Sequence, residues 1–133
     1  MACHLYIHVS WTTLDRRPMI GPSARQFLRR FLPAEAQTHG AIVISTGIVS
    51  DHVHLLLVPP PRWDMPHLVQ MLKGASSRLA NKDPAVSRTG LRWAAGYDAQ
   101  TVSPSCVERV RAYVRDQARR HPDRAIDVQT GAR

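Results

Sequence analysis

Two histidines one residue apart, His52 and His54, could together bind a metal ion. They lie in the segment DHVHLLL, residues 51–57, whose aliphatic run otherwise predicts a buried β-strand. Side chains at i and i+2 of a strand project from the same face, roughly 6.5–7 Å apart. Both imidazoles can therefore reach one divalent cation, whereas Val53 and Leu55 are expected to face the core. The alternative is two ordinary histidines with hydrogen-bonding partners, because burying an imidazole without a partner is unfavourable.

A third ligand and a reactive group must come from whatever covers this face of the strand. Residues 104–121 predict a long helix, in which Tyr113 and Gln117 lie one turn apart on the same side. Gln117 can offer a carbonyl oxygen to a hard cation, and Tyr113 a phenolic nucleophile. The alternative is that Tyr113 is an aromatic residue at the edge of the core and Gln117 is solvated. The neighbouring stripe is expected to pack on the sheet and comprises Val107, Val110, Val114 and Ala118.

The elements that position these residues alternate along the chain. Strands are predicted over residues 4–13, 41–49, 52–58 and 94–103, and helices over 23–37, 67–82 and 104–121, with Ser23 as an N-cap. The first six elements follow the ferredoxin-like (RRM-like) β-α-β-β-α-β pattern, an α+β fold with a four-stranded antiparallel sheet and two helices on one face. The two central strands are apolar on both sides, so we expect the third helix to cover the other face.

The length and composition indicate one globular domain. The chain has 133 residues, of which 44% are hydrophobic, and we expect a single domain over residues 1–121 and a polar, flexible tail over 122–133. No apolar run reaches the ~18 residues of a membrane span, and no signal peptide is evident. The cysteines lack metal-site or redox spacing, which favours a reducing, cytoplasmic environment.

The charge of the chain favours a nucleic-acid partner. It has 18 Lys and Arg residues against 10 Asp and Glu, and all but Lys73 and Lys82 of those 18 are arginine. Arginine binds phosphate through a planar fork of donors, although a GC-rich genome would also favour its codons. The candidate phosphate contacts are Arg16, Arg17, Arg25, Arg29, Arg30, Lys73 and Arg78. Unpaired bases could stack on Trp63 or Trp93. For each of these residues the alternative is a solvated face or core packing.

Four blocks of the sequence resemble one known family. They are HVSWTTLDRRP, SDHVHLLLVPP, LVQMLKGASSR and WAAGYDAQTVSPSCVERVRAYVRDQ, and the resemblance covers roughly residues 4–121. Their order and spacing are similar to those of the single-tyrosine HUH DNA transposases, which include TnpA-like transposases of insertion sequences and REP-associated tyrosine transposases. One departure is Asp98, which stands where an aromatic residue is more usual in the family.

The resemblance implies a role for each candidate residue. His52 and His54, with Gln117 as the third protein ligand, would bind Mg²⁺ or Mn²⁺, and Tyr113 would be the nucleophile. The family nicks single-stranded DNA near imperfect hairpins, keeps a 5′-phosphotyrosine link and frees a 3′-hydroxyl. Insertion-sequence members are homodimers in which the tyrosine helix of one subunit serves the histidines of the other. A bacterial, nucleoid-associated enzyme is therefore expected.

Two other functions fit the same residues. A metal-dependent phosphodiesterase or nuclease would use His52 and His54 to activate water, and it would form no covalent link to DNA. A non-catalytic nucleic-acid-binding module of ferredoxin-like fold would need neither the metal nor Tyr113. His8, which shares a face of the first predicted strand with His4, is expected to pack or hydrogen-bond and to have no catalytic role.

Overall fold

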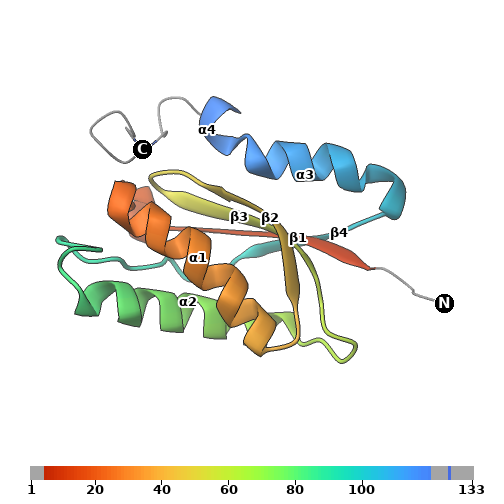
Figure 1. Cartoon of the computed structure of the whole chain (residues 1–133), viewed down its shortest axis with the longest axis horizontal. Helices are drawn as coiled ribbons and strands as arrows, with labels where there is room; N and C mark the ends of the chain where they lie inside the picture. Colours follow the sequence, from red (N-terminus) through yellow and green to blue (C-terminus); the bar gives the residue numbers. More distant parts are fainter. Residues whose placement is uncertain (1–4, 121–125, 127–133) are drawn as a thin grey trace.

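The computed structural model describes residues 5–120 and residue 126. Its elements are β1 (Tyr6–Thr12), η1 (Leu14–Arg16), α1 (Pro22–Thr38), β2 (Ile42–Ile48), β3 (His52–Val58), α2 (Met65–Lys82), β4 (Asp98–Val102), η2 (Pro104–Cys106), α3 (Val107–Arg115) and α4 (Gln117–Arg120). The strands form one antiparallel sheet in the order β2-β3-β1-β4. The predicted ferredoxin-like α+β fold is confirmed (Figure 1).

Helices cover both faces of the sheet. Helices α1 and α2 lie on one face and α3 on the other (Figure 1). The larger core lies beneath α1 and α2, where Val53 and Leu55 of β3 are fully buried. A smaller apolar cluster joins Leu56 of β3 to Val107 and Val114 of α3. Strand β3 is therefore buried on both sides, which explains why its sequence is almost continuously apolar.

The ends of several elements differ from the prediction. Helix α1 begins at Pro22 after Gly21, which makes no side-chain cap, so the prediction of Ser23 as the N-cap was wrong. Proline suits the first turn because its missing N–H has no helical partner there. Helix α2 begins at Met65, two residues before the prediction, because the Asp64 side chain accepts a hydrogen bond of 3.1 Å from the His67 N–H.

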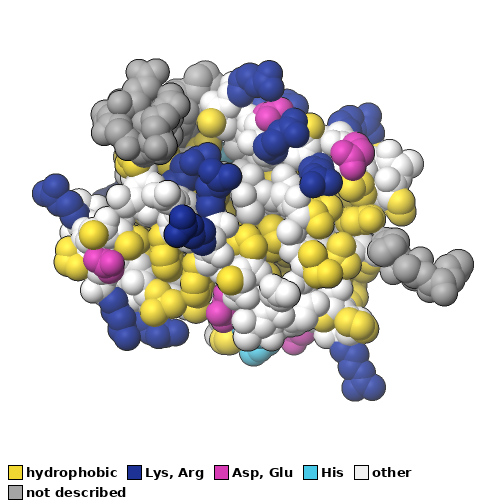
Figure 2. All heavy atoms as spheres, in the orientation of Figure 1, with side chains coloured by type: hydrophobic (Ala, Val, Ile, Leu, Met, Phe, Trp, Pro, Cys, Tyr) yellow, Lys and Arg dark blue, Asp and Glu magenta, His cyan; other side chains and the backbone are white. Residues whose placement is uncertain are grey.

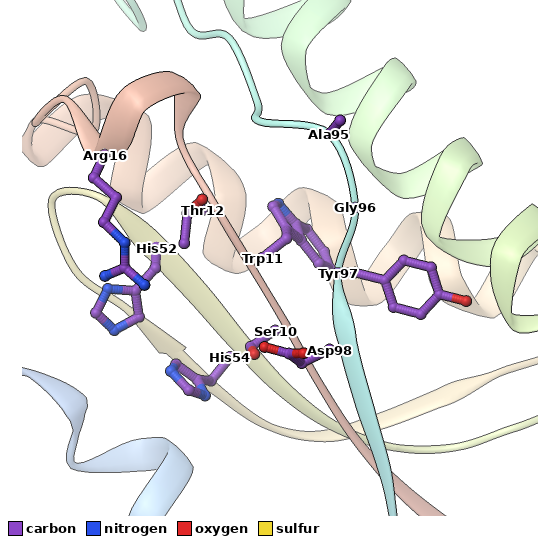
Figure 3. A pocket seen from close by; sticks show the side chains of 10 residues that line it. All are labelled: Ser10, Trp11, Thr12, Arg16, His52, His54, Ala95, Gly96, Tyr97 and Asp98. Atoms are coloured by element: carbon purple, nitrogen blue, oxygen red, sulfur yellow. The ribbon is translucent and has the colours of Figure 1, made fainter.

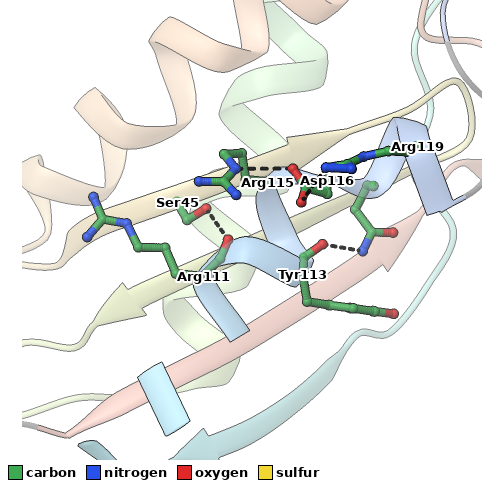
Figure 4. A network of polar contacts seen from close by, with 7 residues as sticks. Ser45, Arg111, Tyr113, Arg115, Asp116 and Arg119 are labelled. Atoms are coloured by element: carbon green, nitrogen blue, oxygen red, sulfur yellow. Dashed lines mark hydrogen bonds and ion pairs between the residues drawn. The ribbon is translucent and has the colours of Figure 1, made fainter. Parts of the chain in front are cut away.

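The predicted helix over 104–121 is not continuous. It is divided into η2, α3 and α4, and Asp116 lies at the break with φ −95° and ψ 24°. The Asp116 carboxylate pairs with Arg115 at 3.1 Å and with Arg119 at 3.3 Å (Figure 4). Short polar side chains such as aspartate favour helix ends over helix interiors. As a result Gln117 turns into the protein and is fully buried, whereas Ala118, predicted to pack on the sheet, is exposed.

The predicted tail is only partly described by the structure. Residues 1–4, 121–125 and 127–133 lie outside the described part of the chain, and with them most of the predicted tail over 122–133. Ile126, which is described, packs against the larger core. Within the described residues, no helix has the length and apolar character needed to cross a membrane.

Candidate active site

The two histidines lie side by side beneath α3. His52 and His54 stand opposite Thr12 and Ser10 in the antiparallel register of β3 with β1. Their ring centroids are 4.9 Å apart, and the ring planes are inclined at 77°. The alternation of β3 thus places both imidazoles on the face that α3 covers, as the spacing predicts.

Side chains on two sides hold the His52 ring. Its Nδ1 lies 2.7 Å from the Asp51 carboxylate, and its Nε2 lies 3.2 Å from Gln117 Oε1. A carboxylate accepts hydrogen bonds, so Nδ1 carries the proton that it donates to Asp51. The Gln117 amide is oriented in turn, because its Nε2 donates a hydrogen bond of 3.0 Å to the Tyr113 carbonyl. The Gln117 oxygen therefore faces the imidazole.

The donor atoms of this site fit a divalent cation. With the ring proton on Nδ1, His52 Nε2 and Gln117 Oε1 both offer lone pairs, and one cation could accept both. Imidazole nitrogen and amide oxygen are both ligands for Mn²⁺ or Mg²⁺. Among the described residues, no three His, Cys, Asp or Glu side chains form a metal-binding group. The Gln117 oxygen is a further candidate ligand beside the two histidines.

A glycine allows α3 to approach the sheet closely enough for this contact. Gly47 of β2 pairs with His54 of β3 and is buried beneath the end of α3. A Cβ atom at Gly47 would overlap the Val114 carbonyl oxygen and lie 2.8 Å from Gln117 Cγ. The absence of a side chain at this position therefore lets Gln117 reach His52.

Tyr113 lies beside the histidines of its own chain. Its ring meets those of His54 and His8 edge-on, with centroids 5.9 Å away in both cases. The guanidinium carbon of Arg120 lies 4.6 Å from the centroid of the Tyr113 ring, within cation–π range. His8 Nε2 and His54 Nδ1 are 2.8 Å apart, so His8 has the hydrogen-bonding role expected for it. Burial lowers the pKa of the His8 imidazole.

An open pocket of about 420 Å³ adjoins the two histidines. Its walls come from β1, from β3 and from the segment that leads into β4 (Figure 3). Arg16, one of the predicted phosphate contacts, lines this pocket, and its side chain points toward His52 (Figure 3). Asp15 and Arg16 have positive φ angles of 55° and 52°, an uncommon backbone conformation that is found at functional sites.

The other predicted phosphate contacts on the first loop and α1 lie away from this pocket. Arg17 is exposed on the loop. Arg25 and Arg29 line a small cleft with Arg115, against Gly47 of β2. Burial, and then the charge of Arg29, lower the pKa of the Arg25 guanidinium.

Lys and Arg side chains also gather around α3 on the face shown in Figure 2. Arg30 lines a separate groove with the stacked rings of Phe27 and Phe31.

Helix α2 carries the two remaining candidate cations. Lys73 Nζ donates hydrogen bonds to the carbonyl oxygens of Ala94 and Gly96 at 2.6 and 2.9 Å. Burial lowers the pKa of the Lys73 ammonium. Arg78 is exposed on the same helix, on the face of the sheet opposite α3. Lys73 therefore holds a chain segment, whereas the Arg78 side chain faces solvent.

The two tryptophans proposed for base stacking differ in burial. Trp93 packs edge-on against Trp11 with ring centroids 5.8 Å apart, and its Nε1 donates a hydrogen bond to Ser76. Trp63 is 44% exposed. The ring of Trp63 is therefore the more accessible one for stacking.

Two contacts of the histidine pair were not among the predictions. Asp51 precedes His52 directly, and its acidic side chain is the sequence signal for the first of them. The contact between His8 and His54 joins residues 46 positions apart, so it depends on the pairing of β1 with β3. The alternation of β1 placed His8 on a definite face, but not opposite a particular histidine.

A ferredoxin-like sheet with a histidine pair, and a covering helix that brings a tyrosine and a buried amide to it, are the features of a small tyrosine-type DNA transposase. Comparison with known families agrees: the chain belongs to the IS200-like transposase family, whose match covers residues 2–117.

Individual relatives are similar to this chain in sequence, in fold or in both. The chain is 30% identical over 117 residues to the ISDra2 transposase TnpA of Deinococcus radiodurans, covering 85% of this chain and 84% of that protein. A crystal structure described as a transposase of Deinococcus radiodurans R1 has a TM-score of 0.66 and 28% identity, covering 88% of this chain and 93% of the other. A REP-associated tyrosine transposase bound to a REP hairpin shares the fold, with a TM-score of 0.66 at 10% identity over 91% of this chain and 70% of the other.

Proposed function

We propose that this transposase nicks and rejoins single-stranded DNA through a 5′-phosphotyrosine on Tyr113, with Mg²⁺ or Mn²⁺ bound by His52, His54 and Gln117. The observation that supports this most strongly is the 3.2 Å approach of Gln117 Oε1 to His52 Nε2, next to the Tyr113 ring. Two candidate metal ligands and the candidate nucleophile thus lie close together, as the proposal requires.

The chemistry follows from the residues. A phenol is mostly protonated at neutral pH and is therefore a weak nucleophile. A bound divalent cation would polarise the scissile phosphate and stabilise charge on the leaving 3′-oxygen. The Tyr113 oxygen forms a bond to phosphorus, the bond from phosphorus to the 3′-oxygen breaks, the phenolic proton passes to solvent, and the 3′-oxygen is protonated. Attack by a 3′-hydroxyl reverses these steps and restores Tyr113, so rejoining needs no ATP.

The proposed substrate is single-stranded DNA marked by a hairpin at the element ends. A structural neighbour bound to a REP hairpin and the formal charge of +8 support a DNA partner. The proposed phosphate contacts are Arg16, Arg17, Arg25, Arg29, Arg30 and Arg78. Lys73 was predicted to be another, but its bonds to two backbone carbonyls favour a structural role. We also propose that the catalytic domain spans residues 1–121 and functions as a homodimer.

The decisive experiment is a test for covalency. A single-stranded oligonucleotide with a hairpin, labelled at its 3′ end because the 5′-phosphotyrosine link keeps the 3′ fragment, is incubated with the protein and Mn²⁺, and the mixture is denatured and separated by electrophoresis. We expect label to migrate with the protein, and Tyr113→Phe or removal of the metal with EDTA to abolish it. Nicking without any adduct would instead support the water-activating phosphodiesterase, and binding without nicking would support the non-catalytic module.

A further inference from the structure

The pocket beside the histidines forms where β4 separates from β1. The two strands pair from Tyr6 with Val102 to Ser10 with Asp98, and contact resumes where the Ala94 N–H donates to the Thr12 carbonyl at 3.0 Å. Between these points, residues 95–97 stand opposite a single residue of β1, Trp11. The extra residues bulge away and leave the pocket of about 420 Å³, a volume within the ~300–1,000 Å³ of small-ligand sites.

The bulge is held in place from the opposite face of the sheet. Lys73 of α2 donates to the carbonyl oxygens of Ala94 and Gly96, as described above. Gly96 has a φ of +87°, which glycine adopts without the steric penalty of a side chain. Tyr97 lines the pocket, but its ring points away from the histidines (Figure 3). A bulge fixed in this way gives a pocket that exists before any ligand binds.

The polar groups of the pocket carry opposite charges. The register places His54, Ser10 and Asp98 in one row across β3, β1 and β4, and Figure 3 shows the Asp98 carboxylate beside Ser10. Within the described part of the chain, neither this carboxylate nor the guanidinium of Arg16 has a hydrogen-bonding or ion-pair partner. A ligand for both groups must offer an anion to Arg16 and N–H donors to Asp98, and a nucleotide does so.

We propose that this pocket binds one unpaired nucleotide at the cleavage junction, with its phosphate on Arg16 and with Asp98 selecting guanine; the inference rests on the proposed function. An ionised carboxylate only accepts hydrogen bonds. Guanine presents two adjacent N–H donors, N1–H and the amino group, on an edge that is accessible in single strands. Thymine presents one N–H between two carbonyl oxygens, which a carboxylate repels. The two parallel bonds to guanine give this pairing both strength and directionality.

The test is the sequence of the DNA that becomes attached to the protein. Single-stranded DNA of random sequence is incubated with the protein and Mn²⁺, and denaturation-resistant adducts are isolated and sequenced at the junction. We expect guanine to be enriched several-fold at one position next to the tyrosine link, and Asp98→Asn to remove that enrichment. Glu108→Gln, which removes an exposed carboxylate of α3 that does not line the pocket, serves as the matched control and should keep the enrichment.

A measurement without cleavage supports the same conclusion. Saturation-transfer NMR with the Tyr113→Phe protein should show tighter binding of 2′-deoxyguanosine monophosphate than of thymidine monophosphate, and Asp98→Asn should remove the difference. Adducts without a base preference at the junction, a preference that survives Asp98→Asn, or equal binding of the two nucleotides would overturn the inference and leave the proposed function intact. Failure of the unmodified protein to form an adduct on any sequence would overturn the proposed function and the inference with it.

Discussion

The imidazole of His52 is oriented by the residue that precedes it. The Asp51 carboxylate accepts the Nδ1 proton at 2.7 Å, and both side chains are 7% exposed. The backbone carbonyl of Asp51 accepts a hydrogen bond from the Thr13 N–H at 2.9 Å, which ties the start of β3 to the end of β1. Such a partner sets which nitrogen faces a metal and raises the basicity of that nitrogen. Asp51 is therefore a positioning residue for His52.

Asp51→Ala should weaken metal binding. Loss of a carboxylate behind a ligating histidine lowers metal affinity by about 10–100-fold, and Asp51→Asn should lower it less because the amide oxygen can still accept the Nδ1 proton. Isothermal titration of Mn²⁺ into each protein measures the effect, with Glu108→Gln as a control whose affinity should be unchanged. Equal affinities for a folded Asp51→Ala protein and the unmodified protein would show that the carboxylate does not position His52.

At the scale of elements, the site depends on how closely α3 packs on the sheet. The strand beneath the end of this helix carries Gly47, and any side chain there would meet the backbone of Val114 and the side chain of Gln117. Backbone cannot move aside as the tip of a side chain can. A methyl group at this position must therefore displace the helix that carries both Tyr113 and Gln117.

Gly47→Ala should destabilise the protein and impair adduct formation, whereas Gly74→Ala should not. Overpacking of this kind costs about 1–3 kcal/mol. Gly74 lies within α2, and a Cβ there meets no atom within 4 Å, so alanine should stabilise the helix by roughly 0.5–1 kcal/mol. Urea unfolding gives the free energy of unfolding for each variant. If the two variants proved equally stable and equally active, α3 would not depend on the glycine.

For the whole molecule, the arrangement of charge separates residues that could bind DNA from residues that hold the fold. Arg25 and Arg29 line a small cleft beside β2, where Arg25 Nε donates one hydrogen bond of 3.4 Å to the Ile48 carbonyl, whereas the Lys73 ammonium donates to two carbonyl oxygens at 2.6 and 2.9 Å. A phosphate contact releases counterions from DNA, and its loss reduces the dependence of affinity on salt. The salt dependence of DNA affinity therefore distinguishes a cation that contacts phosphate from one that stabilises the fold. Affinity measured at a single salt concentration would not separate the two.

Arg25→Ala and Arg29→Ala should each reduce the slope of log affinity against log salt concentration by about 0.7–0.9. Lys73→Met should leave the slope unchanged and lower the stability, because two carbonyl oxygens lose a charged donor. Fluorescence anisotropy of a labelled hairpin oligonucleotide across a salt series gives the slopes. An unchanged slope in both arginine variants would remove the β2 cleft from the DNA-binding surface.

The position of Tyr113 also predicts how two copies of the chain cooperate. The tyrosine lies against His54 and His8 of its own chain, and α3 buries Val107 and Val114 on its own sheet. A mixture of Tyr113→Phe and His52→Ala proteins should therefore form no adduct, since neither copy has both groups. Gel analysis of the mixture against each variant alone provides the measurement. Restored activity would mean that the tyrosine helix is exchanged between subunits.

The order of elements, the face of the histidine pair and the family were predictable from the sequence alone. Strand alternation places His52 and His54 opposite Val53 and Leu55 whatever the rest of the chain does, because side chains of a strand alternate between its faces. The motif spacings that indicate the family are likewise local. Asp51 was available to the same reasoning, because it directly precedes His52.

Only the tertiary structure decided how the site is completed. His52 and Gln117 are 65 residues apart, and their contact requires the helix break at Asp116, the bare backbone of Gly47 and the packing of α3 on β2. The bulge at residues 95–97 opens the pocket, and it also depends on contact between distant elements, because Lys73 of α2 holds it. A periodic pattern reports which face a residue takes within its own element. The partner that it meets depends on how distant elements pack against each other, and no local pattern contains that information.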